Sequence, residues 1–296
     1  IIHLMSKIKK LKNFYNKKKV LITGHTGFVG SWMSLLMIRL GCEVYGISKK
    51  NDVNSINYKL LDISKSFKKE FFLDINDEKL LEEKIRYIKP NIIFHLAAQA
   101  YVLKSYENPI NTFKTNIIGT ANIFECSNLV EDLKGVLCIT SDKCYENLES
   151  INGYSEEDKL GGSDPYSSSK SCAELIALSY RESFYKKESK IIATARAGNV
   201  IGGGDWSKDR LIVDIMNSYK NKNLLNIRNP FAIRPWQHVF DCIHAYLLLS
   251  QRILNLDFSV SQAWNIGPLA SNNKNVKEIL HEIEKNIGFI KYEFKP

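Results

Sequence analysis

Tyr166 and Lys170 have the residue types and the spacing of a proton-transfer pair. They stand four residues apart in a segment whose apolar spacing predicts a helix, so both side chains lie on one helix face. An ammonium beside a phenol favours the phenolate and lowers the pKa of the tyrosine, which makes it a usable general base. A tyrosine and a lysine at this spacing also occur on ordinary surface helices. The pair is therefore a catalytic hypothesis that needs support from elsewhere in the chain.

Three further polar residues, Ser141, Asp142 and Lys143, lie at the end of the apolar segment 135–141. Ligand sites in open α/β sheets lie beyond the carboxyl ends of the strands, which is where these side chains fall. Serine followed by aspartate also suits a plain turn or a helix cap. Together with the tyrosine, the lysine and a set of glycines, the three residues favour a catalytic site.

Those glycines are Gly24, Gly27 and Gly30, which follow the short apolar run 20–23 at intervals of three residues. In a doubly wound sheet the first strand-to-helix turn holds the pyrophosphate of a dinucleotide, because the helix N-terminus supplies free N–H groups and a positive dipole. The first glycine permits the tight turn, the second the close approach of the phosphates, and the third the packing of helix on strand. A strand before the triplet and a helix after it make this a prediction of a dinucleotide site.

The end of the second predicted strand, 43–48, does not decide between NAD and NADP. An acidic residue commonly binds the adenosine ribose at this point, whereas this chain has Lys49 and Lys50. Lysines there would equally favour the 2′-phosphate of NADP. On the residues alone, the choice of dinucleotide stays open.

Apolar segments that alternate with helix-like segments predict an α/β fold with a doubly wound parallel sheet of the Rossmann type. We expect a basic N-terminal extension at 1–19, a dinucleotide-binding domain at 20–200, and a smaller substrate-binding region at 201–296 that is interleaved with the first domain. The predicted strands are 20–23, 43–48, 70–75, 91–98, 135–141 and 190–200, and the predicted helices are 28–40, 77–89, 109–130 and 166–185.

The composition narrows the class of protein. Hydrophobic residues at 44% and charged residues at 25% are typical of a globular chain, and no apolar run of about 18 residues predicts a membrane span. Lysines at 1–20 carry seven of the net +9 charges, which indicates a solvated extension rather than a nucleic-acid or membrane surface. Six cysteines without a CxxC pair predict a reducing, cytoplasmic setting. The six histidines lack ligand spacing, so we expect no metal site.

Taken together, these motifs resemble a known family. The segment 24–30, Asp74, "HLAAQ" at 95–99, Asn116, Tyr166 and Lys170 are similar to the extended short-chain dehydrogenase/reductase family of nucleotide-sugar enzymes. Within that family, the segments that most resemble the 4,6-dehydratases are "GHTGFVGSW", "TSDKCY", "GGSDPYSSSK", "ARAGNVIGGGDW" and "IRPWQHVFD". Epimerases of the family lack an acid and a base at the positions of Asp142 and Lys143.

The resemblance implies a lyase that converts CDP-glucose to CDP-4-keto-6-deoxyglucose and water with bound NAD, a step in deoxysugar and surface-polysaccharide biosynthesis. Tyr166, helped by Lys170 and Ser141, would remove the proton of the 4-hydroxyl. Asp142 resembles the acid that protonates the leaving 6-hydroxyl. Lys143 stands where the relatives place the base for the C5 proton, which requires burial or a neighbouring positive charge to lower its pKa.

The resemblance also implies binding residues and a homodimer. Asn199 and Arg234 would bind the nucleotide sugar, since a guanidinium suits a diphosphate. Two long helices near 109–130 and 166–185 would form the dimer interface. The residues expected around NAD are Gly24, Thr26, Gly27, Phe28, Val29, Gly30, Asp74, Ile75, Leu96, Ala97, Ala98, Thr115, Tyr166 and Lys170.

Two departures from the family leave alternatives open. Val29 stands where the family usually has lysine, and the sequence ends at Pro296, several dozen residues earlier than is usual in the family. We therefore expect a substrate region that is incomplete at its C-terminus. The alternatives are a 4,6-dehydratase or 4-epimerase of a UDP-, GDP- or dTDP-sugar, and an inactive dinucleotide-binding fragment.

Overall fold

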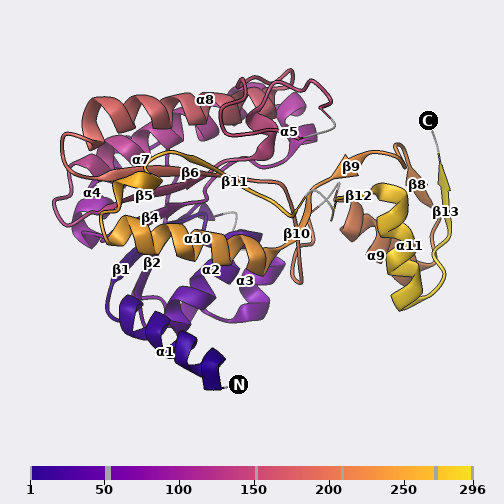
Figure 1. Ribbon diagram of the computed structural model, residues 1–296, viewed down its shortest axis with the longest axis horizontal. Coiled ribbons are helices and arrows are strands. Elements are labelled where there is room, and N and C mark those ends of the chain that lie inside the picture. Colours follow the sequence, from indigo (N-terminus) through magenta and orange to yellow (C-terminus); the bar gives the residue numbers. More distant parts are fainter. Residues whose placement is uncertain (1, 51–54, 151–152, 208–209, 270–272, 295–296) are drawn as a thin grey trace.

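A seven-stranded parallel sheet forms the centre of the molecule (Figure 1). The computed structural model describes residues 2–50, 55–150, 153–207, 210–269 and 273–294. The strands lie in the order β11-β6-β5-β4-β1-β2-β3, which confirms the predicted α/β class and its doubly wound topology. The strands of the sheet are β1 (Lys19–Thr23), β2 (Glu43–Ser48), β3 (Lys69–Phe72), β4 (Ile92–His95), β5 (Gly135–Ile139), β6 (Ile191–Ala197) and β11 (Ala263–Ile266).

Four of the predicted strands end earlier than expected, namely β3, β4, β5 and β6. Strand β3 ends at Phe72, so Asp74 lies in the loop that follows it. The predicted strand 190–200 is broken at Gly198, where an added Cβ would lie 2.6 Å from the Pro235 ring. Beyond this contact the chain leaves the main sheet, and β7 (Asn199–Ile201) pairs with β10 (Trp236–His238) instead.

Helices cover both faces of the sheet because successive strand residues point to opposite sides. Val20 and Ile22 of β1 pack into one core cluster, and Leu21 between them packs into the other. The first face is covered by α2 (Phe28–Arg39) and α10 (Val239–Leu254). The second face is covered by α4 (Glu78–Ile88), α7 (Gly119–Asn128) and α8 (Pro165–Tyr180). Shorter helices are α3 (Ile56–Leu61), α5 (Val102–Glu107) and α6 (Pro109–Phe113), with π-helical turns at Lys114–Ile118 and Arg181–Tyr185.

The N-terminal segment is a helix that is packed at its end, which corrects the expectation of a solvated extension. Helix α1 (Ile2–Tyr15) ends in Tyr15, which is fully buried. The Tyr15 hydroxyl donates to Leu247 O at 3.0 Å and is hydrogen-bonded to Ser250 at 2.6 Å, both on α10. Leu11 and Phe14 pack against the same core. The apolar residues at these helical positions therefore outweigh the basic character of the segment.

The C-terminal third is divided between the main sheet and a smaller unit. Its strand β11 pairs with β6, and its helix α10 lies on the sheet, so the residues after 200 contribute to the first domain as well. Figure 1 shows the smaller unit beside the carboxyl ends of the central strands, where Ile215, Ile227 and Leu280 contribute to a separate apolar core. Its elements are α9 (Leu211–Asn221), β8 (Leu225–Ile227), β9 (Ile233–Arg234), β12 (Lys274–Asn275), α11 (Val276–Ile287) and β13 (Tyr292–Phe294). Among the residues that the structure describes, no helix is long and apolar enough to cross a membrane.

Candidate functional site

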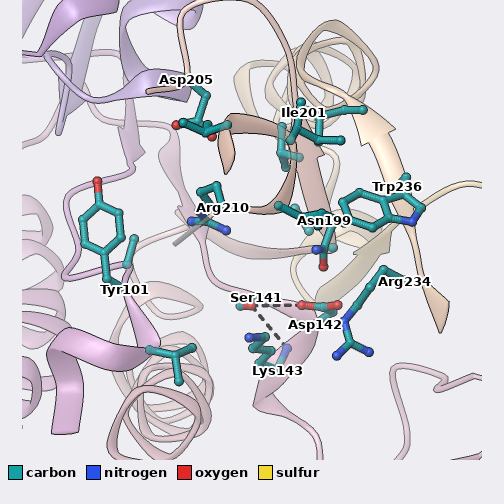
Figure 2. Close-up of a pocket in the computed structure, with 18 of the residues that line it drawn as sticks. Tyr101, Ser141, Asp142, Lys143, Asn199, Ile201, Asp205, Arg210, Arg234 and Trp236 are labelled. Atoms are coloured by element: carbon teal, nitrogen blue, oxygen red, sulfur yellow. Dashed lines mark hydrogen bonds between the residues drawn. The ribbon is translucent and has the colours of Figure 1, made fainter. Parts of the chain in front are cut away.

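Two adjoining cavities of about 640 and 520 Å³ lie where the sheet topology reverses, beyond the carboxyl ends of the strands. We call the larger one the cofactor cavity, because the glycine turn lines it, and the smaller one the sugar cavity (Figure 2). The residues common to both linings are Phe28, Val29, Ala100, Tyr101, Ile139, Thr140, Tyr166, Asp205 and Arg210. Tyr166 is thus at the boundary between the two spaces.

The glycine turn between β1 and α2 has the geometry that its spacing predicted. Gly24 has a φ of +71°, and a Cβ there would lie 2.8 Å from the backbone N of Ala97 in the loop after β4. A Cβ on Gly30 would overlap the carbonyl oxygen of Gly24, so only glycine lets α2 pack on the turn. Gly27 is the N-cap residue of α2 and lines the cofactor cavity. The free N–H groups of the first helical turn therefore begin at the cavity wall.

Two buried hydroxyls in the wall of the cofactor cavity lack a hydrogen-bond partner among the residues that the structure describes. They are Thr26 Oγ1, in the glycine turn, and Thr115 Oγ1, in the π-helical turn at Lys114–Ile118. Buried polar atoms without a partner are uncommon, and a polar ligand accounts for both. The glycine turn and these hydroxyls fit the ribose and phosphate groups of a dinucleotide. The remaining predicted residues in this lining are Phe28, Val29, Ile75, Leu96, Ala97, Ala98, Tyr166 and Lys170.

Asp74 is the one predicted cofactor residue outside the lining of the cavity. Its carboxylate forms an ion pair with Lys49 at 2.9 Å and accepts hydrogen bonds from Asn76. Partial burial acts to raise the pKa of Asp74, but the bonds from Lys49 and Asn76 outweigh it and hold the pKa below its usual value. Lys49 lines the cavity beside Ser48 and Ile75, so the ion pair lies at the edge of the site.

Tyr166 and Lys170 both lie on the first turns of α8 and are buried. The helix begins here because Pro165 fits its first turn and Asp164 caps it by accepting from Ser167 N at 3.0 Å. Lys170 Nζ donates to Ile139 O at 3.3 Å, which ties the lysine to the end of β5. Burial lowers the pKa of Lys170.

The pKa of Tyr166 differs from the sequence-based expectation. Burial raises it above its ordinary value, whereas Ser141 and Arg210 act to lower it. Lys170 was expected to cause the lowering, but its ammonium is itself desolvated and bonded to Ile139. Desolvation of the phenol is therefore the dominant influence on this tyrosine.

Ser141, Asp142 and Lys143 lie shortly after β5 on the wall of the sugar cavity, where Ser141 caps the short helical turn Asp142–Cys144. The Ser141 hydroxyl accepts from Lys143 N at 3.2 Å and donates to Asp142 Oδ1 at 3.1 Å. Burial raises the pKa of Asp142, although Ser141 and the cations nearby oppose this. Burial also lowers the pKa of Lys143, with Arg234 and Arg210 acting in the same direction. One carboxyl thus tends to keep its proton while a neighbouring amine tends to lose its own.

The predicted substrate residues Asn199 and Arg234 line the sugar cavity together with Asp142. Figure 2 shows the side chains of Asn199, Arg234 and Asp142 pointing toward one another. Arg234 comes from β9 of the smaller unit, so the cavity is closed by both parts of the chain.

Sequence reasoning missed two residues that line both cavities, Tyr101 and Arg210. Gln99 holds Tyr101 in place, because its Oε1 accepts from Tyr101 N at 2.6 Å and its Nε2 donates to Tyr101 O at 3.0 Å. The Arg210 guanidinium lies 6.0 Å from the centre of the Tyr101 ring. Neither residue lies in a motif with fixed spacing to Tyr166, so only the fold brings them to the site.

A buried ion pair behind the site joins the elements that carry the catalytic candidates. Glu174, one helical turn after Lys170, pairs with Arg196 of β6 at 2.9 Å. The Glu174 carboxylate also accepts from Thr140, directly after β5, and from Thr194 at 2.8 Å.

Within the described ranges, no group of three or more His, Cys, Asp or Glu side chains lies together as a metal site would require.

Comparison with known proteins finds relatives along almost the whole chain. The family model described as GDP-mannose 4,6 dehydratase matches residues 21–291. A CDP-glucose 4,6-dehydratase of Salmonella typhimurium is 43% identical over 92% of this chain and 77% of its own length. A UDP-glucose 4-epimerase of Mycoplasma genitalium is 26% identical over 90% of this chain and 82% of its own length. The dTDP-glucose 4,6-dehydratase of Bacillus anthracis, solved with NAD, is 24% identical, with a TM-score of 0.78 over 94% of this chain and 84% of that one.

The raised pKa of Asp142 predicts that this residue destabilises the fold at neutral pH. The folded state holds its proton more tightly than the unfolded state, so stability from this group falls as pH rises from about 4 through the folded pKa. Asp142→Asn should therefore raise the melting temperature near pH 8 by about 2–4 °C more than near pH 4. Thermal unfolding across that range measures the difference.

Asp257 provides a control, because its pKa is shifted in the opposite direction to that of Asp142. Bonds from Ser259 and Arg252 lower its pKa to about 2, so its contribution is present above pH 4 and is lost at lower pH. Asp257→Asn should lower the melting temperature near pH 8. If both variants shifted the melting temperature near pH 8 in the same direction, the direction assigned to the pKa of Asp142 would be contradicted.

Proposed function

The chain belongs to the GDP-mannose 4,6-dehydratase family, and from that premise we propose that it converts CDP-glucose to CDP-4-keto-6-deoxyglucose and water with bound NAD. The single observation that carries this proposal is the placement of Asp142 and Lys143 in the sugar cavity beside Tyr166, together with 43% identity to a CDP-glucose 4,6-dehydratase. The reaction needs oxidation at C4 and loss of water across C5 and C6. The candidate base for the oxidation, Tyr166, and the candidate acid and base for the loss of water, Asp142 and Lys143, line one cavity.

In this mechanism Tyr166 is the base for the 4-hydroxyl. NAD, which the glycine turn, Thr26 and Thr115 would hold, would supply the redox chemistry as acceptor and later donor of a hydride. Tyr166 reaches both cavities, so its phenol oxygen can accept the hydroxyl proton where the sugar and the cofactor meet. Its hydrogen bond with Ser141 acts to lower the pKa of Tyr166, against the larger rise that burial causes.

Asp142 and Lys143 supply the acid and the base of the elimination. Burial raises the pKa of Asp142, which favours the protonated carboxyl that can donate to the departing 6-hydroxyl. The lowered pKa of Lys143 favours the neutral amine that can remove the C5 proton, which the 4-ketone has made acidic. Burial thus gives two neighbouring residues opposite tasks, as in other acid–base pairs.

The cofactor cavity favours NAD over NADP. Lys49, the residue best placed to bind a 2′-phosphate, is engaged by Asp74 in the ion pair at 2.9 Å. Asp74 also adds a negative charge at this edge of the cavity, which disfavours a further phosphate.

The cysteines, all six of them free, agree with a cytoplasmic setting.

The competing activity is that of a 4-epimerase, which also oxidises C4 but keeps the 6-hydroxyl. Incubation with CDP-, UDP-, GDP- and dTDP-glucose, followed by the alkali-induced absorbance of 4-keto sugars, separates the candidates. We expect the signal with CDP-glucose. A signal confined to another nucleotide would reassign the substrate, and an inverted C4 with an intact 6-hydroxyl would make the protein an epimerase.

Tyr166→Phe should lower turnover by about 10²–10⁴-fold with little change in NAD affinity, because it removes the base and keeps the ring. Steady-state kinetics and NAD titration by calorimetry measure the two quantities. Tyr154→Phe, at a tyrosine outside both cavities, is the control. Near-normal turnover of Tyr166→Phe would show that another group takes the 4-hydroxyl proton.

Asp142→Asn and Lys143→Met should impair water loss more than oxidation, by on the order of 10²-fold in the elimination step. In a single turnover with CDP-glucose, reduced cofactor should then accumulate and absorb near 340 nm (the ordinary absorbance of reduced nicotinamide). If both variants formed product at the parent rate, these residues would be turn-formers only.

We expect a homodimer through the outer faces of α6–α7 and α8. Ile110 and Ile118 are exposed on the first segment and Leu175 and Leu178 on the second, and these helices pack side by side. Light scattering after size exclusion should give twice the chain mass of 33.9 kDa, and Leu175→Glu should shift it toward the monomer. Leu148→Glu, at a more exposed leucine in a loop, should leave the mass unchanged. A monomeric parent chain would contradict the expectation.

A further inference from the structure

Residues 202–207 form a strap along the wall of the cofactor cavity. This segment follows β7 and precedes α9. Gly204, Asp205, Trp206 and Ser207 line the cofactor cavity, and Asp205 also lines the sugar cavity. The strap therefore forms part of the wall of both cavities.

The strap is attached on one side to the helix that begins at the glycine turn. Trp32 of α2 donates through Nε1 to Gly203 O at 2.9 Å. The Trp32 ring is itself held edge-on against Phe240 of α10, with 5.1 Å between the ring centres. A fixed indole thus holds the middle of the strap.

A second attachment is a close contact between Gly204 and Asn57. Gly204 has a φ of +89°, and a Cβ there would overlap the side chain of Asn57. Asn57 is buried and donates through Nδ2 to Ser31 Oγ at 2.6 Å and to Phe28 O at 3.2 Å. The same asparagine therefore contacts the strap and the first turn of α2, where the pyrophosphate is expected.

The third attachment is to the loop between β4 and α5. Tyr101 donates through its hydroxyl to Ser207 Oγ at 3.2 Å. Tyr101 lies in the chain between β4 and α5, so the strap spans the cavity from α2 to this loop.

We infer that this strap retains the dinucleotide through the whole catalytic cycle, and that Gly204, Trp32 and Asn57 are positioning residues for that retention. The inference rests on the proposed function, because the dehydratase uses its cofactor twice on one sugar. If the reduced cofactor left after the first step, the sugar would remain as CDP-4-keto-glucose or its dehydrated form, without the hydride for C6. A hold on the cofactor that does not touch the reacting atoms prevents this loss.

Two glycines of the strap form a matched pair for the test. Gly204→Ala places a Cβ against Asn57 at a positive φ, whereas a Cβ on Gly203 meets nothing within 4 Å. We expect Gly204→Ala to speed the release of radiolabelled NAD into excess unlabelled NAD by about 5- to 30-fold, and Gly203→Ala to leave it within about twofold. This readout does not depend on turnover.

Leakage during catalysis provides the second readout. Lactate dehydrogenase with pyruvate oxidises reduced cofactor that is free in solution, so lactate formed per CDP-4-keto-6-deoxyglucose counts the failures of retention. Gly204→Ala should raise this ratio above that of the parent and of Gly203→Ala. Equal NAD release and equal lactate in the two alanine variants would overturn the inference.

Trp32→Phe keeps the test decisive if Gly204→Ala fails to fold. It removes the donor to Gly203 O and keeps an aromatic ring against Phe240. We expect NAD release to rise by about 2- to 10-fold. Trp264→Phe is the control for this variant. It removes the hydrogen bond of 3.2 Å from the Trp264 indole to Val260 O, which lies outside both cavities, and it should not change NAD release. If the parent enzyme makes no keto sugar, the proposed function fails, while the NAD release rates still decide whether the strap holds the cofactor.

Discussion

The buried ion pair between Glu174 and Arg196 is the interaction on which the geometry of the site depends. Glu174 is on α8, four residues after Lys170, and it accepts hydrogen bonds from Thr140 at the end of β5 and from Thr194 on β6. The carboxylate therefore sets the register of the helix that carries Tyr166 against the strand end that precedes Ser141. Removing one partner would leave a buried charge unpaired, which costs about 3–5 kcal/mol, so this junction has little freedom to shift.

Burial has opposite consequences for stability and for chemistry at this junction. It raises the pKa of Asp142 and lowers the pKa of Lys143, which disfavours the charged form of each. In the reaction that we propose, these directions favour the protonated carboxyl that an acid needs and the neutral amine that a base needs. Under that proposal, the electrostatic cost at these residues is retained because the reaction needs it.

Much of the fold and of the site could be predicted from local patterns, and what could not depends on distant contacts. Gly24 and Gly30 were predictable because a turn between strand and helix admits no Cβ at these points. Strand β11 and the packing of Tyr15 were not, because both depend on partners more than 60 residues away, Thr194 and Leu247 among them. The direction of the Tyr166 pKa was missed for a related reason. Sequence spacing places Lys170 near the phenol but does not show how deeply both are buried.

The most direct test of the account is the fate of the hydrogen at C4 of the sugar. The chain should convert CDP-[4-²H]glucose to CDP-4-keto-6-deoxyglucose that carries the deuterium at C6, because one bound cofactor takes the hydride from C4 and returns it to the same molecule. Mass spectrometry and proton NMR of the product measure the label and its position. Deuterium found at C4 of a product with an intact 6-hydroxyl, or a product without deuterium at C6, would contradict the account.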